Sequence, residues 1–285
     1  MGRYRKILVA VDGSEQSMHA LRESLKLAVF EKCWITVVSV ALDYNGDLST
    51  TAIGDLRRAL NEPCELALAA ATEMARSERA LIKTVCEQGD PYERIVDLSE
   101  AENADLIVMG RSGRGSIEKT LIGSVTARVI GYSQKDVLVV PSNAEVGWKS
   151  ILFATDGSKY SRAAAARAID FAQSYNGTLT ALSVVDVPDE FYAEATDVAD
   201  AMIMKAKKYA GDVKSEAEAK GIKSEAFVRE GDSAKAILSV AKDVNADVIV
   251  MSSHGRTGLR RLLMGSVTAR VIGFASCPVL VVKSQ

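Results

Sequence analysis

The sequence predicts an α/β protein made of two tandem, doubly wound domains. Three observations carry this prediction. The length of 285 residues suits two domains of ordinary size. The second half of the chain repeats the first, and each half alternates short apolar runs with stretches of helical periodicity. Apolar strands separated by helices indicate a parallel sheet covered on both faces.

The repeat is visible without gaps over its best-matched stretch. Residues 104–131 align with residues 246–273 at an offset of 142, and 17 of the 28 positions are identical. Such self-similarity at one fixed spacing is typical of a tandem duplication. We therefore expect one domain over residues 1–143 and a second over residues 144–285.

The first elements follow from hydrophobic periodicity. Residues 7–11 form a continuous apolar run and predict the first strand, whereas residues 15–30 have helical spacing. Residues 35–40 are a β-branched run and predict the second strand. Residues 56–79 are rich in Ala and Glu, which favours a long, amphipathic and solvated helix.

The remaining elements of the first half continue the alternation. Strands are expected at residues 81–86, 106–109 and 137–140, with helices at 92–102 and from 124 to 131. The second half predicts the same order, and right-handed crossovers make each half a doubly wound, Rossmann-like domain. Its strands are expected near 150–155, 178–184, 223–228, 247–251 and 279–282.

Composition and charge exclude several classes of protein. Hydrophobic residues make up 48% and charged residues 25%, as in an ordinary globular chain rather than a disordered or fibrous one. Lys and Arg number 35 against 37 Asp and Glu, so the formal net charge is −2. This balance disfavours non-specific binding of nucleic acid, but it allows a local site for a small anion.

The sequence also predicts the compartment of the protein and the state of its cysteines. No apolar run approaches the roughly 20 residues that span a bilayer, so we expect a cytoplasmic protein with no membrane partner. Cys33, Cys64, Cys86 and Cys277 are widely spaced, and the chain has only two histidines. We therefore expect four free thiols in a reducing compartment and no zinc site.

A glycine-rich loop follows the fourth predicted strand. Its glycines are expected to adopt positive φ and to let the backbone approach a ligand without a Cβ. Successive N–H groups in such a loop form a concavity that binds anions. The loop runs from Gly110 through Gly113 and Gly115.

Positive charge and a helix start complete this predicted cradle. Gly123 and Ser124 open a helix and add free N–H groups, a hydroxyl and the positive end of the helix dipole. Local cations come from Arg111, Arg114 and Lys119. Together these features predict a site for a di- or triphosphate. The alternative is a plain glycine-rich turn with a capped helix.

Other side chains leave two interpretations open. Asp12 and Asp156 follow the first strand of each half. Each could bond a base, a ribose or a phosphate-bound Mg²⁺, or could form an Asx turn that caps the next helix. His254 is interpreted as a hydrogen-bonding loop residue, and Trp34 and Trp148 as packing residues.

These motifs resemble those of the universal stress protein family. The resemblance rests on Asp12-Gly-Ser14 and on the spacing Gly110-x2-Gly113-x9-Gly123-Ser124, and it extends over both halves. It implies a five-stranded parallel sheet in the order 3-2-1-4-5. In the ATP-binding branch of this family, the glycine motif holds the ribose and the phosphates.

The resemblance implies a role for each matching residue. Ala10, Val11 and Asp12 would line the adenosine pocket, and Val40 would contact adenine through its backbone. Met109 and Gly110 would flank the ribose and α-phosphate, and Gly113 would admit the phosphate chain. The outer phosphates would bind at Gly123, Ser124 and Val125, with Mg²⁺ held mainly through the phosphates. The matching positions in the second half are Thr155, Asp156, Val184, Met251, Gly255, Arg256, Gly265, Ser266 and Val267.

One departure predicts that the two sites are unequal. The first motif glycine of the second half is Ser252. If this position needs positive φ or a close approach of the ligand, the Cβ of serine costs about 1 kcal/mol of binding free energy. This corresponds to a loss of up to roughly tenfold in affinity. We expect the first site to bind ATP with Mg²⁺ and the second to bind it more weakly.

Three functions remain open from sequence. The leading interpretation is a non-enzymatic regulator whose ATP occupancy reports stress. A slow ATPase or nucleotide-transferring enzyme is the second, although the sequence contains no arranged pair of nucleophile and base. A nucleotide-free interaction scaffold is the third. The resemblance also implies an internal pseudo-dimer of the two halves through their last strands, and a further homodimer.

Overall fold

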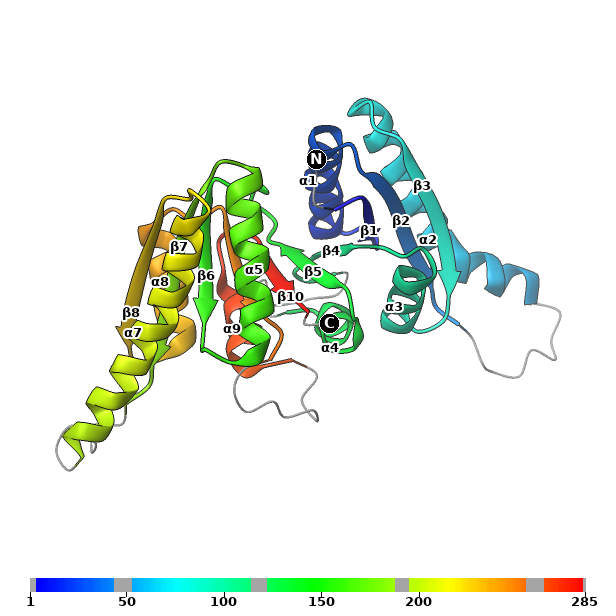
Figure 1. Ribbon diagram of the computed structural model, residues 1–285. Helices are drawn as coiled ribbons and strands as arrows, with labels where there is room; N and C mark the ends of the chain where they lie inside the picture. The colour runs from blue at the N-terminus through cyan, green and yellow to red at the C-terminus, as the bar shows by residue number, and fades with distance from the viewer. Residues whose placement is uncertain (1–3, 44–52, 114–121, 188–194, 255–263, 284–285) are drawn as a thin grey trace. The chain divides into compact units, whose positions relative to one another are not determined.

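The computed structural model describes residues 4–43, 53–113, 122–187, 195–254 and 264–283 (Figure 1). The chain divides into two compact units, residues 1–143 and 144–285. Each unit is a five-stranded parallel sheet with helices packed on it, so the predicted doubly wound class is confirmed. No helix among these described ranges has the length and apolar character needed to cross a bilayer.

The sheet of the first unit has the expected strand order, β3-β2-β1-β4-β5. Ile7 of the central strand pairs with Ile35 on one side and with Leu106 on the other. The strand order therefore reverses between β1 and β4. The elements are β1 Lys6–Ala10, α1 Glu15–Glu31, β2 Trp34–Ala41, α2 Ile53–Ser77, β3 Ile82–Gln88, α3 Pro91–Ala101, β4 Leu106–Gly110, α4 Ser124–Tyr132 and β5 Asp136–Val140.

The second unit repeats this order as β8-β7-β6-β9-β10. Ile151 pairs with Leu179 and Val248, as Ile7 does with its two neighbours. The repeat in sequence is thus a repeat in topology. The elements are β6 Ser150–Thr155, α5 Lys159–Ser174, β7 Thr178–Val185, α7 Thr196–Ala219, β8 Ser224–Glu230, α8 Ser233–Asp243, β9 Val248–Ser252, α9 Ser266–Phe274 and β10 Val279–Val282.

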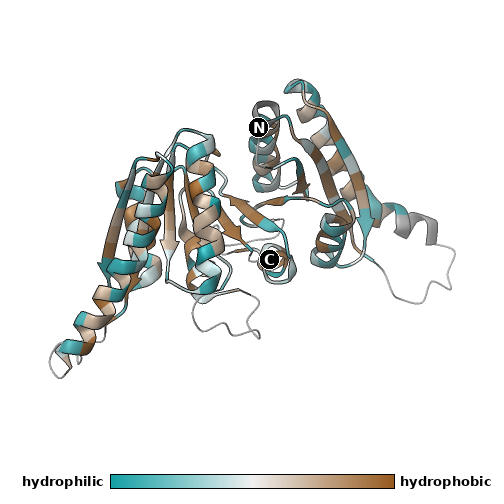
Figure 2. Cartoon of the chain, viewed as in Figure 1, coloured by the Kyte–Doolittle hydropathy of each residue, from teal (hydrophilic) through white to brown (hydrophobic). Residues whose placement is uncertain are grey.

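The core of each unit is its sheet. Every residue of β4 and β5 is buried, and the central strands are largely brown in Figure 2. Strands β3 and β8 are more exposed because each has only one neighbouring strand. Helix α1 packs beside α2, and α3 beside α4. Right-handed crossovers place these two pairs on opposite faces, which leaves the carboxyl ends of the strands accessible between them.

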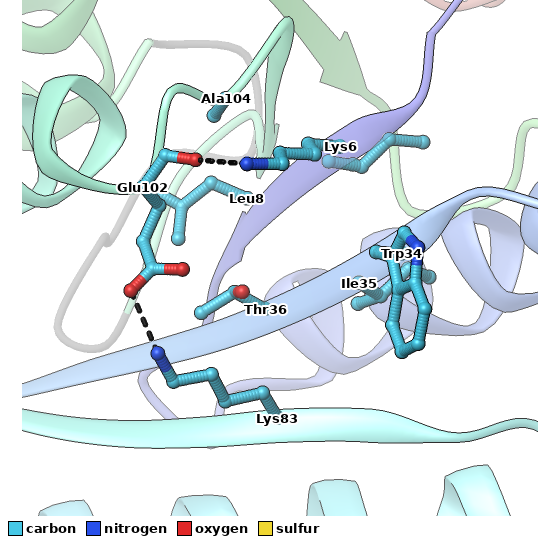
Figure 3. Close-up of a pocket in the computed structure, with 9 residues that line it drawn as sticks. Lys6, Leu8, Trp34, Ile35, Thr36, Lys83, Glu102 and Ala104 are labelled. Atoms are coloured by element: carbon cyan, nitrogen blue, oxygen red, sulfur yellow. Dashed lines mark hydrogen bonds and ion pairs between the residues drawn. The ribbon is translucent and has the colours of Figure 1, made fainter.

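The two tryptophans differ in environment. Trp148 is buried and stacks on Phe171 with ring centroids 4.2 Å apart, which confirms its packing role. Trp34 is 73% exposed, so the same interpretation is wrong for it. Trp34 begins β2 at the sheet edge opposite to the carboxyl ends and borders a hollow of about 230 Å³ there (Figure 3). In that hollow Lys83 Nζ lies 2.7 Å from Glu102 Oε1.

The expectation of four free thiols is wrong for one pair. Cys64 of α2 and Cys86 of β3 form a disulfide, with Cα atoms 6.2 Å apart. The sequence does not reveal this pair, because the two residues meet only when α2 packs on β3. Cys33 and Cys277 are not disulfide-bonded. Burial raises the pKa of the Cys277 thiol to about 11, which keeps it protonated and inert.

Candidate functional site

A cavity of about 730 Å³ opens at the carboxyl ends of β1, β2 and β4 in the first unit. This is where the strand order reverses, the usual place for ligands in doubly wound sheets. The volume lies within the range of small-molecule pockets, roughly 300–1,000 Å³. The structure brings ten of the predicted site residues to its lining: Ala10, Val11, Asp12, Val40, Met109, Gly110, Gly113, Gly123, Ser124 and Val125.

The other predicted residues of this half are placed differently. Arg111 follows β4, and partial burial lowers the pKa of its guanidinium below the ordinary value. Arginine nevertheless stays charged at neutral pH, so a cation remains beside the loop. Arg114, Gly115 and Lys119 lie outside the described residues.

One wall of the cavity was not predicted. Helix α2 supplies it through Ala59, Leu60, Pro63 and Cys64. The sequence predicts the helix but not which of its residues face the ligand site. That choice depends on how the helix packs over the sheet. The disulfide at Cys64 therefore fixes this wall to β3.

The Asx turn proposed for Asp12 is confirmed, whereas its role in binding a ligand stays a prediction. Its Oδ1 accepts hydrogen bonds from the Ser14 backbone N–H at 2.9 Å and from the Ser14 hydroxyl at 2.6 Å, which is an Asx turn before α1. The same carboxylate lines the cavity. A Cβ added at Gly113 would lie 2.3 Å from Asp12 Oδ2. The carboxylate therefore lies directly against the glycine loop.

The glycines act through the missing Cβ rather than through positive φ. Neither Gly110 nor Gly113 has a positive φ, so the prediction is wrong for these two glycines, and Gly115 lies outside the described residues. A Cβ at Gly110 would lie 3.0 Å from the backbone carbon and oxygen of Gln16, so β4 and α1 could not approach as they do. Positive φ occurs instead at Gly13, in the turn after β1 (φ 78°).

Helix α4 directs its N-terminus at the cavity. Its N-cap is Gly123, which provides no side-chain hydrogen bond, and Ser124, Val125 and Thr126 line the cavity. The Thr126 hydroxyl donates to the Gly110 carbonyl at 3.1 Å, which fixes the helix start against the end of β4. Uncapped N–H groups and the helix dipole make this a place for an anion.

A glutamine from α1 supports the loop. Gln16 Oε1 accepts from the Ser112 N–H at 3.1 Å and from the Ser112 hydroxyl at 2.8 Å. The Gly123 N–H donates to the Arg111 carbonyl at 2.9 Å on the other side. The described ends of the loop are thus held by hydrogen bonds from two helices. Sequence reasoning missed Gln16, which carries no motif of its own.

The second unit repeats the backbone of this arrangement. Asp156 Oδ1 accepts from the Ser158 N–H at 2.9 Å, as Asp12 does from Ser14. Gly265 is the N-cap of α9, and the Thr268 hydroxyl donates to the Ser252 carbonyl at 3.2 Å. Predicted residues at matching positions are Thr155, Val184, Met251, Ser266 and Val267; Gly255 and Arg256 lie outside the described residues.

The side chains around the second loop differ from those of the first. The Ser252 hydroxyl donates to the His254 carbonyl at 2.7 Å. His254 Nδ1 lies 3.0 Å from Ser253 Oγ, in agreement with its interpretation as a hydrogen-bonding loop residue. Its ring centroid is 5.9 Å from that of Tyr160, the residue that matches Gln16. Among the residues that the structure describes, no three or more His, Cys, Asp or Glu side chains cluster as a metal site would require.

Comparison with known sequences identifies the repeat. The model of the universal stress protein family matches residues 3–141 and again residues 147–283. A universal stress protein of Methanocaldococcus jannaschii is 40% identical over 146 residues, which cover 50% of this chain and 85% of the relative. One of Mycolicibacterium smegmatis is 27% identical and covers 98% of this chain and 97% of the relative.

Solved structures agree on the fold. The crystal structure of a universal stress protein from Archaeoglobus fulgidus superposes with a TM-score of 0.73 at 24% identity, covering 98% of this chain and 96% of that one. A functionally unknown protein from Pseudomonas aeruginosa gives a TM-score of 0.66 at 21% identity, covering 99% and 93%. Both matches extend over the two units together.

Proposed function

Because this chain belongs to the universal stress protein family, we propose that it is an ATP-binding stress-response regulator. Occupancy by the nucleotide, rather than its turnover, would be the signal. The observation that supports this most is the cavity of the first unit. There a carboxylate, a glycine-containing loop and an uncapped helix start share one space of about 730 Å³.

The residues present fit a nucleotide triphosphate. Phosphates would accept hydrogen bonds at the start of α4, from Ser124 and Val125, where the helix dipole favours negative charge. The absence of a Cβ at Gly113 lets the Asp12 carboxylate lie against the loop, beside the space where the phosphate chain would bind. Adenosine would lie along Ala10 and Val40. Bound Mg²⁺, held mainly through the phosphates, would neutralise part of their charge.

A regulatory role is favoured over catalysis by the state of the carboxylate. Asp12 Oδ1 is engaged by both donors of Ser14, which suits positioning better than activation of a water. We therefore propose a cytoplasmic, non-enzymatic protein. Its two domains would pair through residues 137–140 and 279–282 as an internal pseudo-dimer, and two chains would form a further homodimer.

Titration calorimetry with ATP and Mg²⁺ on Gly113→Val tests the proposal. The new side chain would displace the Asp12 carboxylate, because a Cβ there lies 2.3 Å from its Oδ2. We expect the affinity to fall at least 100-fold, a loss of about 2.7 kcal/mol. Gly211→Val is the matched control, because a Cβ at that position meets no atom within 4 Å. It should bind ATP as the unaltered chain does.

Two outcomes would contradict the proposal. If the unaltered chain binds no ATP, the nucleotide-free scaffold is the better account. If phosphate is released steadily over many turnovers, and Gly113→Val abolishes that release, the protein is an enzyme.

A further inference from the structure

The second unit differs from the first at the helical wall of its site. Tyr209 of α7 stands where α2 of the first unit has Ala67. We match Tyr209 to Ala67 because the two helices align at an offset of 142 residues, and this alignment pairs buried positions with buried positions. The pairs are Cys64 with Ala206, Ala71 with Val213 and Ala75 with Ala217, and all six are buried.

The ring of Tyr209 lies against the turn that follows β6. A Cβ added at Gly157 would be 2.4 Å from Tyr209 Cε1 and Cζ, so the ring and the Gly157 backbone are in direct contact. Gly157 has a φ of 73°, and it follows Asp156 as Gly13 follows Asp12. Asp12 lines the open cavity of the first unit, so the ring lies against the turn that carries its counterpart, Asp156.

The ring also covers the helix side of the same space. A side chain on a helix leans toward the N-terminus and covers the preceding turn. For Tyr209 that turn carries Lys205 and Ala206. Their counterparts, Pro63 and Cys64, line the cavity of the first unit. Tyr209 therefore lies between two walls that enclose open space in the first unit.

Ser252, the other difference at the second site, has a different effect. Its hydroxyl is accommodated by a hydrogen bond to the His254 carbonyl at 2.7 Å. At the matching Gly110, a Cβ would be close to the backbone of α1 rather than inside the cavity. The substitution of glycine by serine thus changes how the strand packs on the helix, whereas the Tyr209 ring lies against the turn that follows Asp156.

We infer that Tyr209 closes the second nucleotide site, so that each chain takes one adenine nucleotide, in its first unit. Tyr209 thus decides whether the second unit can take a nucleotide. Exchanging it for alanine, the residue of the first unit, opens a second site. The inference rests on the proposed function, because the ligand class is taken from the first cavity.

Titration calorimetry with ATP and Mg²⁺ on Tyr209→Ala tests it. The expected stoichiometry is two nucleotides per chain, against one for the unaltered protein. Tyr209→Phe is the matched control, since it keeps the ring and should remain at one. Tyr209→Ala combined with Gly123→Val assigns the new site, because the remaining single nucleotide must then lie in the second unit. Thermal unfolding verifies the fold, and Tyr209→Leu replaces Tyr209→Ala if the latter is unfolded.

The outcomes separate this inference from the proposed function. One nucleotide per chain for both the unaltered protein and the Tyr209 variants overturns the inference and leaves the proposed function standing. Two for the unaltered protein also overturns it. No nucleotide for the unaltered protein but one for Tyr209→Ala supports closure of the second site by Tyr209 and overturns the assignment of a nucleotide to the first unit. No nucleotide in any variant overturns both.

Discussion

The two units share a strand order and matching helix starts, yet the side chains at their strand ends differ. In the first unit, Gln16 holds Ser112 by two hydrogen bonds and α2 presents Ala67. In the second, Tyr160 faces His254 and α7 presents Tyr209. A duplicated backbone therefore does not guarantee a duplicated site, because a few side chains decide whether the space between the strands and helices stays open.

The units also differ in how they are stabilised. The first carries the Cys64–Cys86 disulfide between α2 and β3, where the second has Ala206 and Val228 at the matching positions. The second carries Trp148, where the first has Tyr4, whose hydroxyl donates to Asp136 at 3.1 Å. Each unit thus has a stabilising interaction that the other lacks.

The largest expected effect comes from Trp148→Ala. Removing a buried indole stacked on Phe171 should destabilise the second unit by about 3–5 kcal/mol. Hydrogen exchange resolved by peptide should show faster exchange across residues 144–285 and little change in the first unit. Equal loss of protection in both units would contradict a local effect of Trp148.

Removal of the disulfide should destabilise the first unit rather than the second. A bridge that closes a 22-residue separation contributes about 3 kcal/mol through the entropy of the unfolded chain. Cys64→Ala with Cys86→Ala should therefore lower the denaturant midpoint of the first unit, and ATP affinity should fall because Cys64 lines the cavity. Cys33→Ala is the control. An unchanged first unit would show that the bridge contributes nothing to its stability.

A smaller effect is expected from exchanging the first motif glycine. Gly110→Ser gives the first unit the residue of the second and pushes its Cβ toward the Gln16 backbone, 3.0 Å away. We expect about tenfold weaker ATP binding, or about 1.4 kcal/mol. Ser252→Gly alone should not open the second site, since Tyr209 remains. If it does, serine rather than tyrosine is the barrier.

The smallest effect concerns acid stability. The hydrogen bond from Arg270 to Asp232, 2.6 Å long, lowers the pKa of that carboxyl below its ordinary value. A lowered pKa contributes stability above the ordinary Asp range, near pH 4, and this contribution is lost as the pH falls through the folded value. Asp232→Asn should make the second unit less sensitive to pH below about 4. An unaltered acid transition would contradict this.

Much of the fold was predictable because local patterns and topology agree. Short continuous apolar runs such as residues 7–11 are typical of buried strands, and the repeat tests each assignment twice. The glycine motif of the first half was also predictable as a group of neighbours, because β1 and β4 end at the same edge of the sheet. Ten of its residues line one cavity; that they bind a nucleotide stays a prediction.

The rest depends on packing that no local pattern encodes. Tyr209 and Ala67 could have been compared by aligning the repeats, but only the packing of α7 shows that the ring reaches Gly157. The pairing of Cys64 with Cys86 likewise depends on how α2 lies over β3. Trp34 was misjudged because a strand start at the sheet edge can face open space rather than a helix.

The central claim is that the two sites are unequal and that the first binds an adenine nucleotide. Calorimetric titration of the unaltered chain with ATP and Mg²⁺ tests it most directly. We expect one tight site per chain, lost in Gly113→Val and retained in Tyr209→Phe. Two equal tight sites, or no binding at all, would contradict it.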